Sequence, residues 1–335
     1  MVESAQRARR TFAVLGLVVA IVAIAAVGTV FAVTERIGDT IPRIPDPFTA
    51  LDPATRPPPS AVMTFLLVGT DSRSAEPTTG EDGTGPSSVP GAQRSDVVML
   101  AQVSADRQGA TVVSIPRDGW VEIPGRGRAK VNAAYAWGGP ALLVATVEKL
   151  TGVRVDHFAV IDFAGFRSVV DAVGGVDVGV AAATTSAGVT FQAGVNHLDG
   201  EAALVYMRQR HELAGGDVAR AARQQNVLRA VLGKLVAVGV LGRFAFLDAV
   251  TRSISLDATL SNSGVRAMAL DLRGLHPEQV AFLGAPVRGM GTEGAQSVVL
   301  LDDARAAALW AALRNGTPAA YAQQHPDDLL GPTPV

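Results

Sequence analysis

The sequence predicts an α/β fold built as one large domain. Short apolar runs, typical of buried strands, occur beside longer segments whose apolar residues recur at helical spacing. The 335-residue chain is 48% hydrophobic and 18% charged, which allows a full core and excludes a mostly disordered protein. The length also permits two domains of about 150 residues each, but one larger α/β domain is the interpretation that we favour.

The N-terminal segment predicts a membrane anchor. Residues 12–33 form an uncharged, overwhelmingly apolar run of 22 residues, long enough to cross a hydrocarbon core of about 30 Å. Arg7, Arg9 and Arg10 precede it, and the positive-inside rule places residues 1–11 in the cytoplasm. A cleaved signal peptide is the alternative, but its apolar region is normally about 7 to 15 residues long. We expect a signal-anchored, single-pass protein of the cell membrane with an extracytoplasmic domain.

The rest of the chain divides by composition. Residues 34–60 predict a Pro-rich extracytoplasmic linker, because seven prolines fall between positions 42 and 60. Residues 61–314 are expected to form the folded domain. Residues 315–335, rich in proline and polar side chains, predict a flexible C-terminal tail.

Three strands are expected early in the domain. Residues 62–69 form an apolar run closed by Gly-Thr-Asp, and residues 96–103 and 110–115 form two more, joined by a polar turn. Residues 74–93, rich in Pro, Gly, Ser and Thr, predict a long loop. The charged residues next to these runs are therefore expected at strand ends.

Three helices are expected further along the chain. Residues 141–150, ended by Gly152, and residues 163–173, ended by Gly174, have helical spacing with glycine stops. A third helix is expected over residues 217–236, with Asp217 as its N-cap. Its apolar segment, like that of the first helix, lines either the core or a tunnel for a lipid chain, and the core is the interpretation that we favour.

Several classes of site are excluded or unsupported. The chain has no cysteine, so it has no disulfide, thiolate nucleophile or cysteine-based metal site. The net charge of −2 argues against nucleic acid as a partner. No Walker A sequence and no GxSxG elbow is present, and the five histidines lack metal-ligand spacing. Residues 289–294 match GxGxxG, but a strand-like segment follows them, which favours a hairpin.

Arginines and acids recur beside the apolar runs although charge is sparse in this sequence. This pattern is typical of a site that holds a polyanion together with a divalent cation. Arg220 and Gln224 follow Asp217 at i+3 and i+7, on one face near the positive end of the third helix. A solvated helix face is the alternative reading of these residues. Arg208 and Arg210 alternate upstream as on an extended segment, which favours convergence on one anion.

Seven motifs, in order, resemble those of the LytR-CpsA-Psr (LCP) family. They are FLLVGTDSR at 65–73, RSDVVML at 94–100, SIPRD at 114–118, KVNAAY at 130–135, DAVGGVD at 171–177, YMRQR at 206–210 and DVARAARQQ at 217–225. The resemblance is strong over about residues 61–240 and weak elsewhere. It implies a three-layer α/β/α sandwich around a largely antiparallel or mixed sheet. It also implies a membrane-anchored phosphotransferase that moves a glycopolymer from a polyprenyl-pyrophosphate carrier onto peptidoglycan.

The same resemblance assigns roles to individual residues. Asp71 and Asp96 correspond to magnesium-associated acids, with manganese as a possible substitute. Six further residues correspond to the pyrophosphate-binding set of the family. They are Arg94, Arg117, Arg208, Arg210, Arg220 and Gln224. Asp71, Arg94, Asp96 and Arg117 are the expected catalytic residues. For the general base, Asp71, Asp96 and Asp118 remain open, since Asp118 also fits a structural pair with Arg117.

Two other functions remain open on the same residues. One is a pyrophosphatase acting on the same lipid-linked glycan, with water in place of the wall hydroxyl. The other is a noncatalytic lipid-binding scaffold of the cell-wall machinery, which predicts binding without turnover. No residue specifies which glycopolymer is carried.

Overall fold

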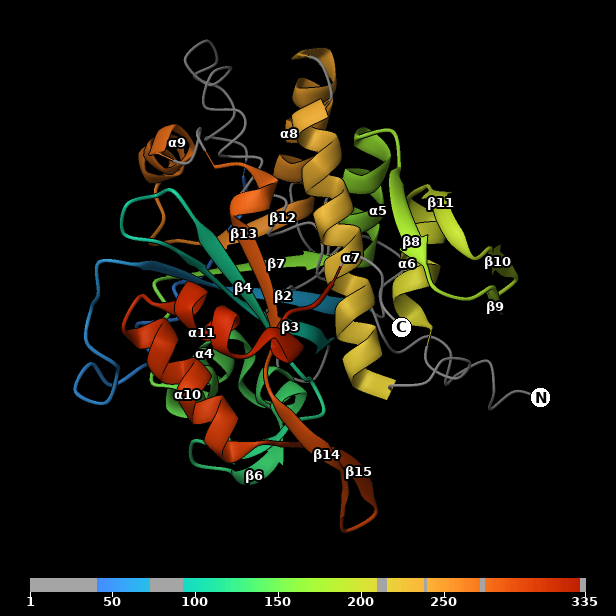
Figure 1. The fold of residues 1–335 in the computed structure, drawn as a ribbon. Coiled ribbons are helices and arrows are strands. Elements are labelled where there is room, and N and C mark those ends of the chain that lie inside the picture. The colour runs from blue at the N-terminus through green and yellow to red at the C-terminus, as the bar shows by residue number, and fades with distance from the viewer. Residues whose placement is uncertain (1–40, 73–92, 210–215, 238–239, 272–274, 332–335) are drawn as a thin grey trace.

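A seven-stranded sheet in the order β1-β12-β7-β2-β3-β4-β13 forms the centre of the molecule in a computed structural model (Figure 1). The structure describes residues 41–72, 93–209, 216–237, 240–271 and 275–331. In sheet order the strands are β1 Arg43–Ile44, β12 Ile254–Asp257, β7 His157–Asp162, β2 Met63–Ser72, β3 Gln93–Val103, β4 Ala110–Ile115 and β13 Val280–Gly284. Three neighbouring pairs are parallel and three are antiparallel, so the sheet is mixed.

Helices cover both faces of this sheet, because its central strands are apolar on both sides. In β2, Phe65 and Leu67 pack into one core, and Leu66 and Val68 pack into the other. The helices of the first face are α5 Phe163–Ala172, α6 Gly200–Arg208, α7 Gly216–Ala237, α8 Val240–Ser253 and α9 Asn262–Asp271. Those of the second face are α4 Val131–Thr151, α10 Asp303–Arg314 and α11 Pro318–Gln324 (Figure 1).

Four two-stranded ribbons surround the main sheet. They pair β5 Trp120–Ile123 with β6 Gly127–Lys130, β8 Val176–Val180 with β11 Gly194–Leu198, β9 Thr184–Ser186 with β10 Val189–Phe191, and β14 Val287–Glu293 with β15 Gln296–Leu301. The β14–β15 ribbon projects away from the body of the molecule (Figure 1). It contains the GxGxxG match, so the hairpin interpretation is confirmed. Two short 3-10 helices, Pro277–Gln279 and Pro326–Asp328, complete the described elements.

The expected strands and helices are confirmed, with one extension. Helix α4 ends at the left-handed Gly152, as predicted, but begins ten residues earlier than expected, at Val131. A kink explains the difference, since Gly138 and Gly139 have non-helical dihedrals and Pro140 follows them. Because Gly-Gly-Pro interrupts the helical spacing of apolar residues, periodicity alone does not predict the first two turns of α4.

The segment expected to be a spacer is partly built into the fold. Residues 43–44 form β1, which pairs in parallel with β12. Arg56 makes an ion pair of 2.7 Å with the buried Glu148 of α4 and donates a second hydrogen bond of 2.6 Å to the carbonyl oxygen of Val155. The folded unit therefore includes residues 41–60, which pack against it and do not extend away as a linker.

The C-terminal segment is also ordered further than expected. Helix α11 and the turn at 326–328 lie within the region predicted to be a flexible tail. Leu329 forms a bridge with Leu283 of β13, and the amide of Leu330 donates to the carbonyl oxygen of Phe282. The predicted membrane span, residues 12–33, lies outside the described residues. Within the described part of the chain, no helix combines the length and apolar character needed to cross a bilayer.

Candidate functional site

Three strands place the predicted site residues at one edge of the sheet. Strand β2 ends at Ser72, β3 begins at Gln93 and β4 ends at Ile115. Because β3 is antiparallel to both neighbours, these three ends lie together. Asp71 is the register partner of Arg94 across β2 and β3. The backbones of these two residues are described, whereas their side-chain placement lies outside what the structure describes.

A β-bulge sets the position of Asp96. Gly69 pairs with Val97 and Thr70 pairs with Ser95, so Asp96 is the additional residue on β3 without a cross-strand partner. Bulges re-aim a side chain and are common beside active sites. The hydroxyls of Thr70 and Ser95 flank this residue, and both are buried without a hydrogen-bond partner among the described residues.

Asp96 and Arg117 form a buried ion pair at the centre of the site. Asp96 is 1% exposed and Arg117 is 8% exposed, and the Arg117 Nη1 atom donates to the Asp96 carboxylate. A buried carboxylate needs such a partner because desolvation alone disfavours its charge. The structure thus brings together two of the predicted catalytic residues.

The loop that carries Arg117 is fixed on both sides by backbone hydrogen bonds. The Asn132 amide of α4 donates to the Arg117 carbonyl oxygen at 3.0 Å, and the Val131 amide donates to Gly119 at the same distance. On the other side, the Val299 amide of β15 donates to the Asp118 carbonyl oxygen at 2.9 Å. The guanidinium therefore sits on a rigid support between α4 and the β14–β15 ribbon.

The Asp118 side chain lies between two cations. Its carboxylate is 3.4 Å from the Arg117 Nε atom and 3.2 Å from the Lys130 Nζ atom. This arrangement orients the Arg117 guanidinium and introduces a lysine that the sequence did not assign to the site. The expected pairing of Asp118 with Arg117 is present.

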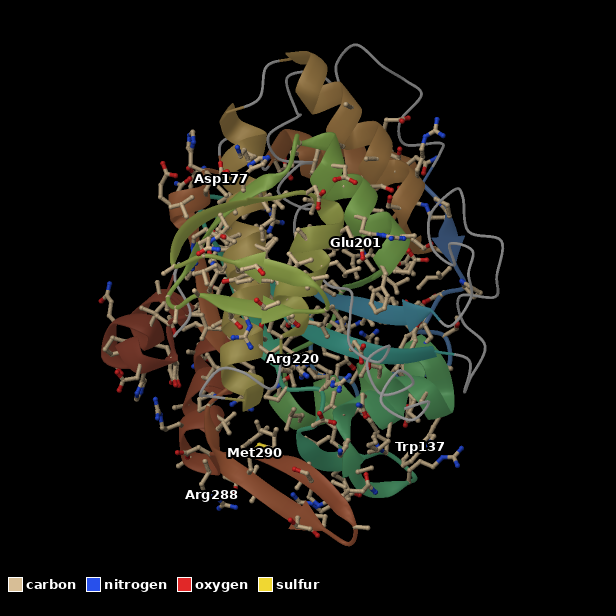
Figure 2. The ribbon with its side chains drawn as sticks, turned by 90° about the vertical axis from the view of Figure 1, so that its right-hand side faces the viewer. Trp137, Asp177, Glu201, Arg220, Arg288 and Met290 are labelled. Atoms are coloured by element: carbon tan, nitrogen blue, oxygen red, sulfur yellow. The ribbon has the colours of Figure 1, made fainter. Side chains whose placement is uncertain are left out.

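Helix α7 brings Arg220 and Gln224 to the same edge. The buried Gln225 amide donates to the Ser114 hydroxyl at 2.8 Å and to the Leu283 carbonyl oxygen at 3.0 Å, which anchors α7 beside the end of β4. Arg220 and Gln224, within about one turn of this anchor, are 4% and 5% exposed. They do not form a solvated helix face. Arg220 lies in the middle of the face shown in Figure 2, above Trp137 and Met290.

Two expectations about neighbouring segments need correction. Helix α7 begins at Gly216, so Asp217 lies in its first turn and is not the N-cap. Helix α6 extends through Arg208, so Arg208 and Arg210 do not share one extended segment. Arg210 lies outside the described residues, as does the position of the Arg208 side chain.

Residues with oxygen donors, the kind of ligand that Mg²⁺ prefers, lie along this edge of the sheet. Asp96 and the backbone of Asp71 are here, as are Thr70 and Ser95, whose buried hydroxyls have no hydrogen-bond partner among the described residues. Mg²⁺ commonly binds through one or two carboxylates plus substrate phosphates. Among the described side chains, no group of three acidic or histidine residues gathers.

A cavity lies apart from the ion pair. It has a volume of about 700 Å³ between residues 50–56 and α4, and neither Asp96 nor Arg117 lines it. The apolar side chains of residues 143–147 and 227–232 that are fully buried belong to the two cores. Ala141, Leu142 and Ala145 line the cavity instead, so the core interpretation holds for residues 227–232 and only in part for the first segment.

Sequence reasoning missed several residues that shape the site. Each of them contacts a residue from an element distant in the chain. They are Lys130, Arg223 and Gln225. Helical spacing offered one signal, since Arg223 follows Arg220 at i+3, on the face that also carries Gln224. No local pattern indicates the bulge at Asp96.

Comparison with known proteins identifies relatives of this chain. Residues 48–315 match the LytR_cpsA_psr family. The probable cell wall biosynthesis protein LcpB of Corynebacterium glutamicum is 34% identical over 268 residues, covering 78% of this chain and 63% of LcpB. The polyisoprenyl-teichoic acid–peptidoglycan teichoic acid transferase TagU of Enterococcus faecalis is 35% identical over 213 residues, covering 63% of this chain and 66% of TagU.

Solved structures share the fold. TagT bound to LI-WTA has a TM-score of 0.59 and 25% sequence identity, covering 85% of this chain and 99% of that chain. The matches to LcpB and TagU span less than two thirds of the length of those relatives. The family match itself includes the β2–β4 edge and α7, and it covers most of this chain. The chain therefore belongs to the LytR_cpsA_psr family.

Proposed function

We propose that this protein is a phosphotransferase that moves a glycopolymer from a polyprenyl-pyrophosphate carrier onto peptidoglycan. The single observation that carries the proposal is the buried Asp96–Arg117 pair, held at a strand edge beside the buried Arg220 and Gln224. The similarity to TagU, named as a teichoic acid transferase, supports the same reaction class.

The proposed chemistry is a displacement at phosphorus. An acceptor hydroxyl of peptidoglycan attacks the phosphorus next to the glycan, and the bridging P–O bond of the diphosphate breaks. The polyprenyl phosphate leaves, and the hydroxyl proton passes to a carboxylate, for which Asp71, Asp96 and Asp118 are the candidates. Arg94, Arg117, Arg208, Arg210, Arg220 and Gln224 form the proposed diphosphate-binding set.

Preorganised charge supplies the proposed catalysis. Arginine guanidinium groups bind phosphate oxygens through paired hydrogen bonds, and a buried site strengthens this attraction. Asp71 and Asp96 would hold Mg²⁺ or Mn²⁺, which neutralises developing charge on the leaving phosphate when bound. Asp118 also orients Arg117 in this scheme, because its carboxylate lies between the Arg117 and Lys130 cations.

The proposed location follows from the N-terminal sequence. Residues 12–33 would anchor the chain in the cell membrane, with residues 1–11 in the cytoplasm and the folded domain outside. A membrane-attached domain meets both the lipid-linked donor and the wall acceptor. Nucleic acid is not an expected partner.

The test uses the full chain in detergent with a synthetic polyprenyl-pyrophosphoryl glycan, magnesium and peptidoglycan. Mass spectrometry of the lipid and wall fractions identifies the products. We expect glycan on the wall and polyprenyl phosphate in the lipid fraction, both lost in R117A. Free phosphoglycan without wall attachment would instead identify a pyrophosphatase. Intact bound lipid would identify a noncatalytic binding protein.

A further inference from the structure

Arg223 is a buried cation of α7 that the proposed diphosphate-binding set leaves out. It is 2% exposed and is among the largest fully buried side chains described. It follows Arg220 by three residues and directly precedes Gln224. On a helix, residues three apart have Cβ atoms about 5 to 6 Å apart, so Arg223 lies immediately behind the predicted anion site.

The guanidinium of Arg223 is only partly satisfied. Its Nη2 atom donates to the Gln209 carbonyl oxygen at 2.7 Å. Its Nε and Nη1 atoms have no hydrogen-bond partner, and no carboxylate pairs with it, within the described part of the chain. Burial lowers the pKa of Arg223, although the nearby Tyr206 opposes this effect. The Arg223 guanidinium thus lies in a buried environment that disfavours its charged form.

The hydrogen bond to Gln209 does not itself require a charge. A neutral amide donates equally to a backbone carbonyl, and a buried cation without a counter-ion is costly to the fold. The Arg223 charge therefore does not contribute to the stability of the fold, and binding of an anion would explain its presence. The nearest predicted anion is the diphosphate that Arg220 and Gln224 face.

Gln209, whose carbonyl oxygen accepts the hydrogen bond from Arg223, lies in sequence between two predicted phosphate-binding residues. Gln209 follows Arg208 at the end of α6 and precedes Arg210. Asn226 donates to the Tyr206 hydroxyl at 3.1 Å, which joins α6 to α7 one turn further along. The Arg223–Gln209 bond therefore fixes the backbone at the end of α6, one residue after Arg208.

We propose that Arg223 is a positioning residue of the diphosphate site. It fixes the backbone at Gln209, and it keeps behind Arg220 and Gln224 a positive charge that no described carboxylate neutralises and that the bound diphosphate compensates. The proposal rests on the proposed function for the identity of the anion.

The test measures binding of inorganic pyrophosphate to the full chain in detergent by calorimetry, together with thermal melts without ligand. R223Q keeps a donor for Gln209 but removes the charge. We expect its pyrophosphate affinity to fall about tenfold, because a unit charge at this range is worth about that factor in a partly buried site. Its melting temperature should stay equal or rise. R223K, which keeps the charge, should recover most of the affinity.

Arg229 on the same helix provides a matched control. It is a half-buried arginine whose pKa is also lowered by burial, and its Nη2 atom donates to the Leu330 carbonyl oxygen at 2.7 Å. It lies about 9 Å further along α7, against Phe282. R229Q should bind pyrophosphate as the unmodified protein does.

Three outcomes would overturn the proposal. They are unchanged affinity in R223Q, a fall in affinity that comes with a lower melting temperature and is not recovered in R223K, or no pyrophosphate binding by the unmodified protein. The proposed function is decided separately by the transfer assay with R117A. If R117A loses transfer while R223Q binds pyrophosphate normally, the proposed function stands and only the role of Arg223 fails.

Discussion

Arg117 connects the candidate site to several elements of the fold. Its guanidinium pairs with Asp96, its carbonyl oxygen accepts a hydrogen bond from α4, and the next carbonyl accepts one from β15. Three elements therefore determine where one charge lies. A charge fixed before substrate arrives needs no reorganisation during reaction, which is the basis of electrostatic catalysis.

We expect R117A to lower the transfer rate about a hundredfold to a thousandfold, as removal of a preorganised donor does in other enzymes. The mass-spectrometric transfer assay measures the loss, and circular dichroism reports whether the variant folds. R128A is the matched control, because Arg128 is an exposed arginine on the nearby β6 that donates only to the Trp120 carbonyl oxygen. Full transfer by R117A would remove the assignment.

D118N separates a positioning role from a general-base role. The asparagine oxygen still accepts a hydrogen bond from Arg117 or Lys130, so a positioning residue should lose about tenfold or less in rate. A general base contributes roughly a hundredfold to ten-thousandfold, and its loss also removes one limb of the pH–rate profile. Initial rates across pH distinguish the two, and a loss beyond a hundredfold would make Asp118 the base.

At the scale of elements, the kink of α4 determines how this helix leaves the site. Gly139 has φ 61° and ψ −153°, a conformation that residues with a Cβ rarely adopt. G139A should destabilise the protein by about 1 to 3 kcal/mol in urea unfolding. Gly233 in α7 is the control, since a Cβ there meets nothing within 4 Å, and G233A should be neutral or stabilising by up to about 1 kcal/mol. Equal effects would mean that the kink is not strained.

Asp257 ties β12 to β7 through hydrogen bonds to its carboxylate. The Phe158 amide donates to it at 2.9 Å, and His157, Thr259 and the Leu260 amide also contact it. Burial raises the pKa of Asp257, but the hydrogen bonds from His157, Thr259 and Phe158 outweigh burial, so the net pKa is lowered. The carboxylate is therefore more acidic in the folded state than in the unfolded state.

This sign sets the pH dependence of stability. A lowered folded pKa contributes stability above the unfolded value of about 3.9, and that contribution is lost as pH falls through the folded value. D257N should lose about 2 kcal/mol near neutral pH and show a flatter decline below about pH 4. Urea unfolding from pH 3 to pH 7 measures both. A parallel decline in the two proteins would contradict the predicted shift.

The strands that form the candidate site are predictable from the sequence, whereas the contacts between them and their neighbours are not. Strands β2, β3 and β4 are continuous apolar runs, so periodicity finds them and places Asp96 and Arg117 at strand ends. The Asp96 bulge depends on register between strands, and the Arg223–Gln209 bond depends on the packing of two helices. Local patterns contain neither piece of information.

At the scale of the whole molecule, terminal segments complete both edges of the central sheet. Residues 43–44 add β1 beside β12, and Leu329 forms a bridge with Leu283 of the opposite edge strand, β13. Exposed sheet edges favour association with other chains, so covering them protects the fold. Sequence reasoning treated the first segment as a linker and the second as a flexible tail, because proline and polar residues dominate both. Pairing between residues far apart in the chain, such as Arg43 and Leu256, leaves no local signal.

The segment 41–60 should therefore be required for full stability. A chain that begins at residue 61 loses β1 and the Arg56–Glu148 pair, and it leaves the Glu148 carboxylate buried without its cation. Breaking such a pair costs about 3 to 5 kcal/mol, so this chain should unfold at clearly lower urea than one beginning at residue 41. R56M in the full chain should reproduce most of the loss. R167A, which breaks an exposed pair with Glu201, should cost less than about 1 kcal/mol. Equal unfolding midpoints for the chains starting at 41 and 61 would show that this segment packs on the domain without stabilising it.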